Sequence, residues 1–173
     1  MNYDAVLLRE HSRSNTDAIA KAIGNNAAEL KKIIDIIYNQ KAPLPQRAAW
    51  LLAAVNDKYP ELLEPYIPLF INSIQKFKIA GIKRNMALVL ASHKIPVKLQ
   101  GRLINVCFDL MLSADETVAV KVYAMQAIAN IALLHQELQP ELKAAIEDQL
   151  PKTSAAFQSR AKHVLKSFDN KLK

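Results

Sequence analysis

The residues that most often carry out chemistry are scattered along this chain, without the spacing that a catalytic or metal site needs. The four histidines are His11, His93, His135 and His163. None of them has a second metal ligand four residues away, so no zinc-binding pair lies on one helical face. The three glycines are isolated, so no glycine-rich loop can cradle a phosphate group. We therefore expect no enzymatic activity, no metal and no other cofactor.

Cys107 is the only cysteine, so the chain cannot form an internal disulfide. It lies in the apolar segment Val106–Leu112, where a thiol behaves as a small hydrophobic side chain. The first ten residues contain acids and no long apolar core, unlike a secretory signal. No stretch approaches the roughly 20 apolar residues of a membrane span. We therefore expect a cytoplasmic protein with a reduced thiol and no membrane contact.

Charge is unevenly distributed along the chain, whose net charge is +7. No acidic residue occurs between Glu64 and Asp109. The cations in this window are Lys76, Lys78, Lys83, Arg84, Lys94, Lys98 and Arg102. A basic surface attracts phosphate groups, so nucleic acid is one partner to consider.

The elements that must position these side chains repeat along the sequence. Similar segments begin with a cation at Arg47, Arg84 and Lys121, which are separated by steps of 37 residues. A fourth segment begins at Arg160, after 39 residues. Apolar residues recur within the segments at spacings of three and four, which places them on one face of a helix. Such a repeat predicts helical hairpins whose stacking buries a continuous apolar core.

Each of these helices pairs with an apolar helix that precedes it. The preceding helices are predicted at Glu29–Tyr38, Glu64–Lys76, Val97–Leu112 and Pro140–Leu150. Pro65 and Pro68 fit the second of them because a first helical turn tolerates proline. The prediction is an all-α superhelix, or solenoid, forming one domain over residues 1–173. Its parts are an N-terminal cap of two short helices at 1–27 and hairpins at 28–57, 61–94, 97–135 and 139–172.

The two groups of basic residues fall at successive inter-helix turns of this solenoid. Since such turns line opposite edges, we expect two solvated rims and not one continuous groove.

Trp50 is the only tryptophan, and a single aromatic ring in a basic repeat protein could stack on a nucleobase. Asp57 lies two helical turns further on the same face. In the register of the repeat, however, Trp50 occupies the position of Ala87 and Ala124, which are small core residues. We therefore expect the ring to fill space between hairpins.

A polar pattern also repeats at the 37-residue step, at Asn56, His93 and Asn130. Repeated asparagine side chains can pair with the backbone of a bound extended peptide, and we take these residues as the candidate partner-binding site. The alternative is that they cap helices, since all three lie near predicted helix C-termini.

The segment Leu103–Ile128 resembles a HEAT repeat. An apolar helix is followed by a turn with Asp115, and the next helix then starts with a valine and a cation, here Lys121. The segment Pro65–Phe70 also resembles the first helix of that family. The resemblance to HEAT and armadillo-type proteins implies an α-α superhelix without naming an activity. Lys41 and Lys78 replace the turn aspartate in the preceding repeats.

The pattern favours a non-enzymatic scaffold that holds a protein or peptide on the concave face of the superhelix. The alternative is nucleic-acid binding through the basic rims, in the manner of the HEAT-like DNA glycosylases, which use an aromatic residue and an acid in a concave cleft.

Overall fold

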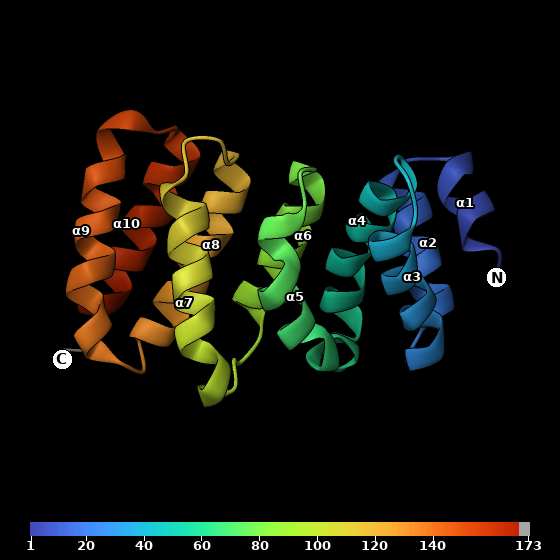
Figure 1. The fold of residues 1–173 in the computed structure, drawn as a ribbon, viewed down its shortest axis with the longest axis horizontal. Coiled ribbons are helices and arrows are strands. Elements are labelled where there is room, and N and C mark those ends of the chain that lie inside the picture. The colour runs from blue at the N-terminus through green and yellow to red at the C-terminus, as the bar shows by residue number, and fades with distance from the viewer. Residues whose placement is uncertain (170–173) are drawn as a thin grey trace. The chain divides into compact units, whose positions relative to one another are not determined.

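Helix formation follows the apolar periodicity of the sequence along the described chain. The computed structural model describes residues 1–169, and this range contains α-helices and 3-10 helices but no strand (Figure 1). The prediction of an all-α solenoid of stacked hairpins with a short N-terminal cap is confirmed. The chain divides into two compact units, Met1–Val89 and Leu90–Lys173. That these units form a single domain stays a prediction.

The two units contain the following elements. The N-terminal unit contains α1 (Tyr3–Arg9), α2 (Arg13–Ile23), α3 (Ala27–Asn39), α4 (Leu44–Lys58), η1 (Pro60–Tyr66), α5 (Ile67–Ser73), η2 (Ile74–Lys76) and most of α6 (Ala80–Ser92). The C-terminal unit contains the end of α6, α7 (Val97–Leu112), α8 (Val118–Ala132), η3 (Gln136–Leu138), α9 (Gln139–Gln149), η4 (Leu150–Lys152) and α10 (Ala155–Asp169).

Side-chain caps define where the first three helices begin. Asn2, Ser12 and Asn26 precede α1, α2 and α3, and each side-chain oxygen accepts a hydrogen bond from a backbone N–H in the first turn. Such a cap satisfies an amide that has no partner within the helix and typically contributes about 1 kcal/mol. The N-terminal cap of the solenoid therefore consists of two helices whose starts are fixed by the local sequence.

The helix predicted from Glu64 to Lys76 is shorter than expected. Its α-helical part, α5, covers only Ile67–Ser73, with the 3-10 helices η1 and η2 on either side. Pro65 and Pro68 lack the N–H that an α-helix requires, and Pro68 is accepted because it lies in the first turn of α5. The predicted α-helix was therefore too long at both ends.

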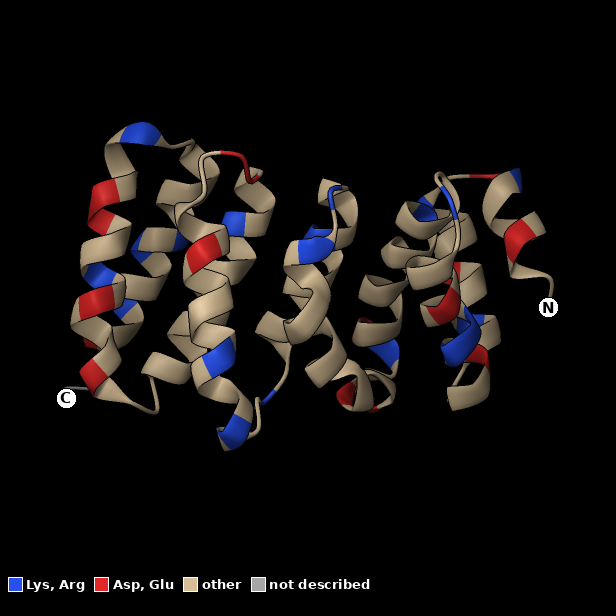
Figure 2. Ribbon diagram, in the orientation of Figure 1, with Lys and Arg blue, Asp and Glu red and all other residues tan. Residues whose placement is uncertain are grey.

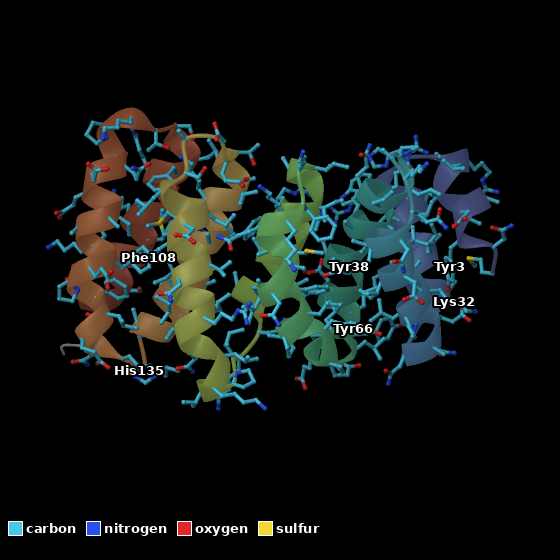
Figure 3. The ribbon with its side chains drawn as sticks, in the orientation of Figure 1. Tyr3, Lys32, Tyr38, Tyr66, Phe108 and His135 are labelled. Carbon is cyan, nitrogen blue, oxygen red and sulfur yellow. The ribbon has the colours of Figure 1, made fainter. Side chains whose placement is uncertain are left out.

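Within the N-terminal unit, α4 packs against α1, α2 and α3. Arg47, the cation that opens its repeat segment, donates from Nη1 to the carbonyls of Leu7 and Leu8 at distances of 2.8 and 3.1 Å. These carbonyls end α1, where the helix dipole favours a positive charge. The hydroxyl of Tyr3 in α1 donates to Glu29 Oε2 in α3 at 2.6 Å (Figure 3). Burial of Tyr3 and its bond to the carboxylate raise the pKa of this phenol.

Within the C-terminal unit, α8 packs against both α7 and α10. Figure 1 shows α7 and α9 in the layer nearer the viewer, with α8 and α10 behind them. Small residues of α8 let its neighbours approach closely, and Ala124 and Ala132 are fully buried. Cys107 on α7 is also buried, which raises the pKa of its thiol to about 12. The thiol therefore stays protonated at neutral pH and acts as a core residue, as predicted.

Candidate binding surfaces

A groove of about 430 Å³ opens in the C-terminal unit where α6 ends, α7 begins and α8 ends. The side chains that shape it include Ile95, Ile131, Leu134, His93, Gln100 and Asn130. Ile95 and Ile131 are buried beneath it, whereas Leu134 is 63 % exposed at its wall. Two of the three residues of the predicted polar ladder, His93 and Asn130, thus lie together at one hollow.

The side chain of Asn130 also makes hydrogen bonds within the chain. Its Nδ2 donates to the carbonyl of Ala91 at 2.7 Å, and its Oδ1 accepts from Gln126 Nε2 at 2.8 Å. Gln126 in turn accepts from Nη1 of Arg160 at 2.9 Å. This row of hydrogen bonds joins the end of α6 to α8 and α10. Asn130 therefore caps a carbonyl at a helix C-terminus, which is the alternative role that the sequence offered for the ladder.

A second set of hydrogen bonds fixes the wall of the groove formed by α7. Gln100 is 9 % exposed, and its Nε2 donates to the carbonyl of Ile95 at 3.1 Å. The Oε1 of Gln100 lies 3.0 Å from Nε2 of His135, which follows α8 (Figure 3). Because these bonds tie the start of α7 to the turn after α8, the groove is preformed.

A smaller pocket, of about 180 Å³, lies in the N-terminal unit between α2, α4 and Arg84 of α6. The functional side chains around it are Arg13, Asp17, Trp50, Asp57 and Arg84. It carries two arginines and two aspartates, so its formal charge is balanced. The sequence suggested that Trp50 and Asp57 share a helical face, and both line this one pocket.

Trp50 is only half-buried, so the prediction that it belongs to the core is wrong. Its ring lies against that of His11, with the ring centroids 4.5 Å apart and an interplanar angle of 50°. His11 precedes the N-cap of α2. The indole therefore extends from α4 toward the start of α2 and stays partly exposed, while Ala87 and Ala124 at the same repeat position are buried. The repeat register could not reveal this contact, because His11 lies outside the repeated segments.

Asn56, the first residue of the predicted ladder, lies near the end of α4 in the N-terminal unit. Its Oδ1 is buried and accepts no hydrogen bond from the described residues. Asn56 belongs to a different unit from the groove that His93 and Asn130 share, so the predicted three-residue site is divided between two units. Its partner-binding role stays a prediction.

The stacked helical hairpins are those of a known protein family. Residues 3–168 match the model of the HEAT repeat domain. The chain belongs to the HEAT repeat family. Comparisons with curated proteins and with solved structures gave no significant match.

As a HEAT repeat protein, the chain is a helical repeat scaffold, and members of this family are generally non-enzymatic. The resemblance of Leu103–Ile128 and Pro65–Phe70 to HEAT helices is therefore confirmed at the level of the family. Among the described residues, no helix is long and apolar enough to span a bilayer. No cluster of histidine, cysteine or acidic side chains in that range could hold a metal ion.

The seven cations of the acid-free window divide between the two units of this HEAT scaffold. Lys76, Lys78, Lys83 and Arg84 surround the turn before α6 and the first turns of that helix in the N-terminal unit. Lys94, Lys98 and Arg102 lie before and within the first turns of α7 in the C-terminal unit. Figure 2 shows both groups as blue ribbon segments. All except the half-buried Lys83 are exposed, and their binding to nucleic acid stays a prediction.

Proposed function

We propose that this HEAT repeat protein binds a protein or peptide partner, and that the groove lined by His93, Asn130 and Leu134 receives part of that partner. The observation that carries the proposal is that two residues singled out by the 37-residue polar pattern line one preformed hollow. The last turns of two second helices, α6 and α8, contribute Ser92, Ala127, Asn130 and Ile131 to its lining, and we expect the second helices to form the concave face of the superhelix. Cytoplasmic localisation is part of the same proposal.

The size and chemistry of the groove support a peptide segment as its occupant. Its volume of about 430 Å³ lies within the range of roughly 300–1,000 Å³ that ligand pockets occupy. Apolar walls with a few fixed polar groups can bury one side chain and orient the backbone beside it. Leu134, largely exposed in the free protein, is the side chain with the most apolar surface to lose on binding.

Leu134→Glu is expected to weaken binding of a groove ligand at least tenfold. Burial of a leucine side chain contributes about 1.5–3 kcal/mol, which corresponds to a factor of roughly 10 or more in Kd. The ligand would be selected from a random peptide library displayed on phage, and its affinity measured by fluorescence anisotropy.

Leu112→Glu is the matched control, because Leu112 is a 44 % exposed leucine at the end of α7 in the same unit. The selected peptides should bind this variant as tightly as the unchanged protein. Equal affinity for the Leu134 and Leu112 variants would place the peptide elsewhere, and a selection without saturable binders would count against the proposal as a whole. Asn130 is less suitable as a first target, because its substitution also removes the hydrogen bonds to Ala91 and Gln126.

Nucleic-acid binding is the second candidate, because Trp50 and Asp57 line a common pocket beside two arginines. Against it, the two aspartates balance the two arginines of the pocket, whereas a phosphate backbone favours uncompensated positive charge.

We expect no saturable binding of labelled 20-nucleotide single-stranded or double-stranded DNA, or of RNA, at 50 mM salt. Fluorescence anisotropy measures this directly. Saturable binding that weakens steeply between 50 and 200 mM salt and is lost in Lys83→Glu/Arg84→Glu would establish the second candidate instead.

A further inference from the structure

The pocket around Trp50 has an ordered distribution of charge along its two main helices. From α4 it is lined by Trp50, Ala53, Ala54 and Asp57, which follow the spacing of one helical face. Seven residues at ~1.5 Å each place Asp57 about 10 Å beyond Trp50 along the helix. The small side chains of the two alanines leave the space between them open.

The α2 side of the pocket also ends in an acid, and it begins with a cation. His11 lies against Trp50, so α2 begins at the Trp50 end of the pocket. Arg13 follows at once, and Asp17 lies one turn further along. The residues of α4 that line the pocket extend from Trp50 at one end to Asp57 at the other. Since α2 begins beside Trp50 and also lines the pocket, it runs in the same direction as α4, and Asp17 lies nearer Asp57 than Arg13 does.

Arg84 adds a second cation to the Trp50 end. The 37-residue step gives it the register of Arg47, three residues before Trp50. Second helices of successive hairpins run parallel in a stack of this kind. Arg84 of α6 therefore lies level with the part of α4 that comes just before Trp50. By backbone position the pocket is therefore dipolar: both arginines come from helix positions at the Trp50 end and both aspartates from positions further along, although Arg13 Nε reaches Asp17 Oδ2 at 3.8 Å.

Existing ion pairs leave much of this charge available to a ligand. Arg13 Nε and Asp17 Oδ2 are 3.8 Å apart, with side-chain exposures of 85 % and 45 %, so this pair is weak and easily rearranged. Among the described residues, the side chains of Asp57 and Arg84 have neither a hydrogen bond nor an ion pair. One carboxylate and one guanidinium of the pocket thus remain uncompensated within the described chain.

We propose that this pocket binds a basic amino acid, arginine or lysine, either free or as the C-terminal residue of a peptide. The α-carboxylate pairs with Arg13 and Arg84, and the side-chain cation pairs with Asp17 and Asp57. The apolar stem between these charges packs on the indole of Trp50. A volume of about 180 Å³ is below that of pockets for drug-sized ligands and suits a single residue.

This site lies in the N-terminal unit and does not depend on the groove around Leu134. It can therefore be present whether or not a peptide binds that groove.

Trp50 makes the test specific to this site, because it is the only tryptophan of the chain. L-arginine, L-lysine and a short peptide ending in arginine with a free carboxylate are titrated while the indole emission is recorded. We expect a saturable change with at least one of these probes. If only the peptide changes the emission, the ligand is the C-terminal residue of a peptide. If only the amino acids change it, the ligand is the free amino acid.

Three compounds test the two charged ends separately. Agmatine and the C-terminal amide of the peptide lack the carboxylate, and norleucine lacks the side-chain cation. Each is expected to bind at least tenfold more weakly than its parent. Equal binding of agmatine and arginine, or of norleucine and lysine, would overturn the assignment of that end, and no response to any probe would overturn the site.

We expect two variants, Asp57→Asn and Arg84→Gln, each to raise the Kd of the bound amino acid or peptide at least tenfold. Glu61→Gln removes an exposed charge from the same unit and is the control, for which the Kd should not change. Asp57 and Arg84 are exposed, so both variants should keep the far-UV circular dichroism of the unchanged protein. Unchanged affinity in both variants would show that Trp50 senses binding elsewhere.

Discussion

Replacing Phe157 with alanine is expected to lower the free energy of unfolding by about 3–5 kcal/mol. Phe157 is fully buried and lies on the apolar face of α10 with Ala161 and Val164. This face packs against α8 and α9, so α10 closes the last hairpin of the described chain. Deletion of the ring removes its burial and leaves a cavity that the rigid neighbouring helices cannot fill.

Urea denaturation measures this change, with far-UV circular dichroism and Trp50 emission recorded on the same samples. Gln158→Ala is the control, because Gln158 is the exposed neighbour of Phe157 and should change stability by less than about 0.5 kcal/mol. In a repeat protein each hairpin contacts only its neighbours, so a substitution in one hairpin destabilises that region first. We therefore expect the Phe157 variant to lose part of its ellipticity before Trp50, in the N-terminal unit, responds. A change in stability below 1 kcal/mol would contradict the burial of this ring.

The fold could be predicted because its main determinant is periodic. Stacked hairpins need an apolar face at the same place in every repeat, and the 37-residue step between Arg47, Arg84 and Lys121 exposes that requirement directly. The part that periodicity could not give is the first helix of the second hairpin. There the backbone chemistry of Pro65 replaces α-helical turns with the 3-10 turns of η1, and α5 begins only at Ile67.

The candidate sites were less predictable, because they depend on contacts between residues far apart in the sequence. The amide of Asn130 reaches the carbonyl of Ala91, and Gln126 receives a hydrogen bond from Arg160. A ladder in the sequence shows that a position repeats, but it does not show whether the side chain faces a partner or another helix. Gln100, which shapes the groove by its bond to Ile95, has no counterpart in the repeated pattern and gave no signal.

Trp50 illustrates the same limit at the level of packing. Positions 50, 87 and 124 are equivalent in the repeat, yet only the tryptophan is partly exposed. A large ring is accepted there because it rests on His11 at the edge of the N-terminal cap. Equivalence in the repeat therefore fixes which face of the helix a residue occupies, while the neighbouring elements decide how large that residue can be.

Ala124→Trp is accordingly expected to destabilise the protein by about 3 kcal/mol or more, because overpacking of a core forces backbone and rotamer shifts. Ala124 is fully buried on α8, which packs against both α7 and α10, so there is no surface onto which an indole could extend. Urea denaturation followed by circular dichroism gives the size of the effect.

Val122→Trp and Trp50→Ala are the two controls for this substitution. Val122 is half-buried on the same helix, so an indole there can lie on the surface, and a loss of less than about 1 kcal/mol is expected. Trp50→Ala should cost less than the roughly 3–5 kcal/mol of a fully buried tryptophan, since part of the ring is already in water. If Ala124→Trp were as mild as Val122→Trp, α8 could not be packed closely between its neighbours. The small residues of the repeat would then have to be explained by helix propensity and not by the close approach of helices.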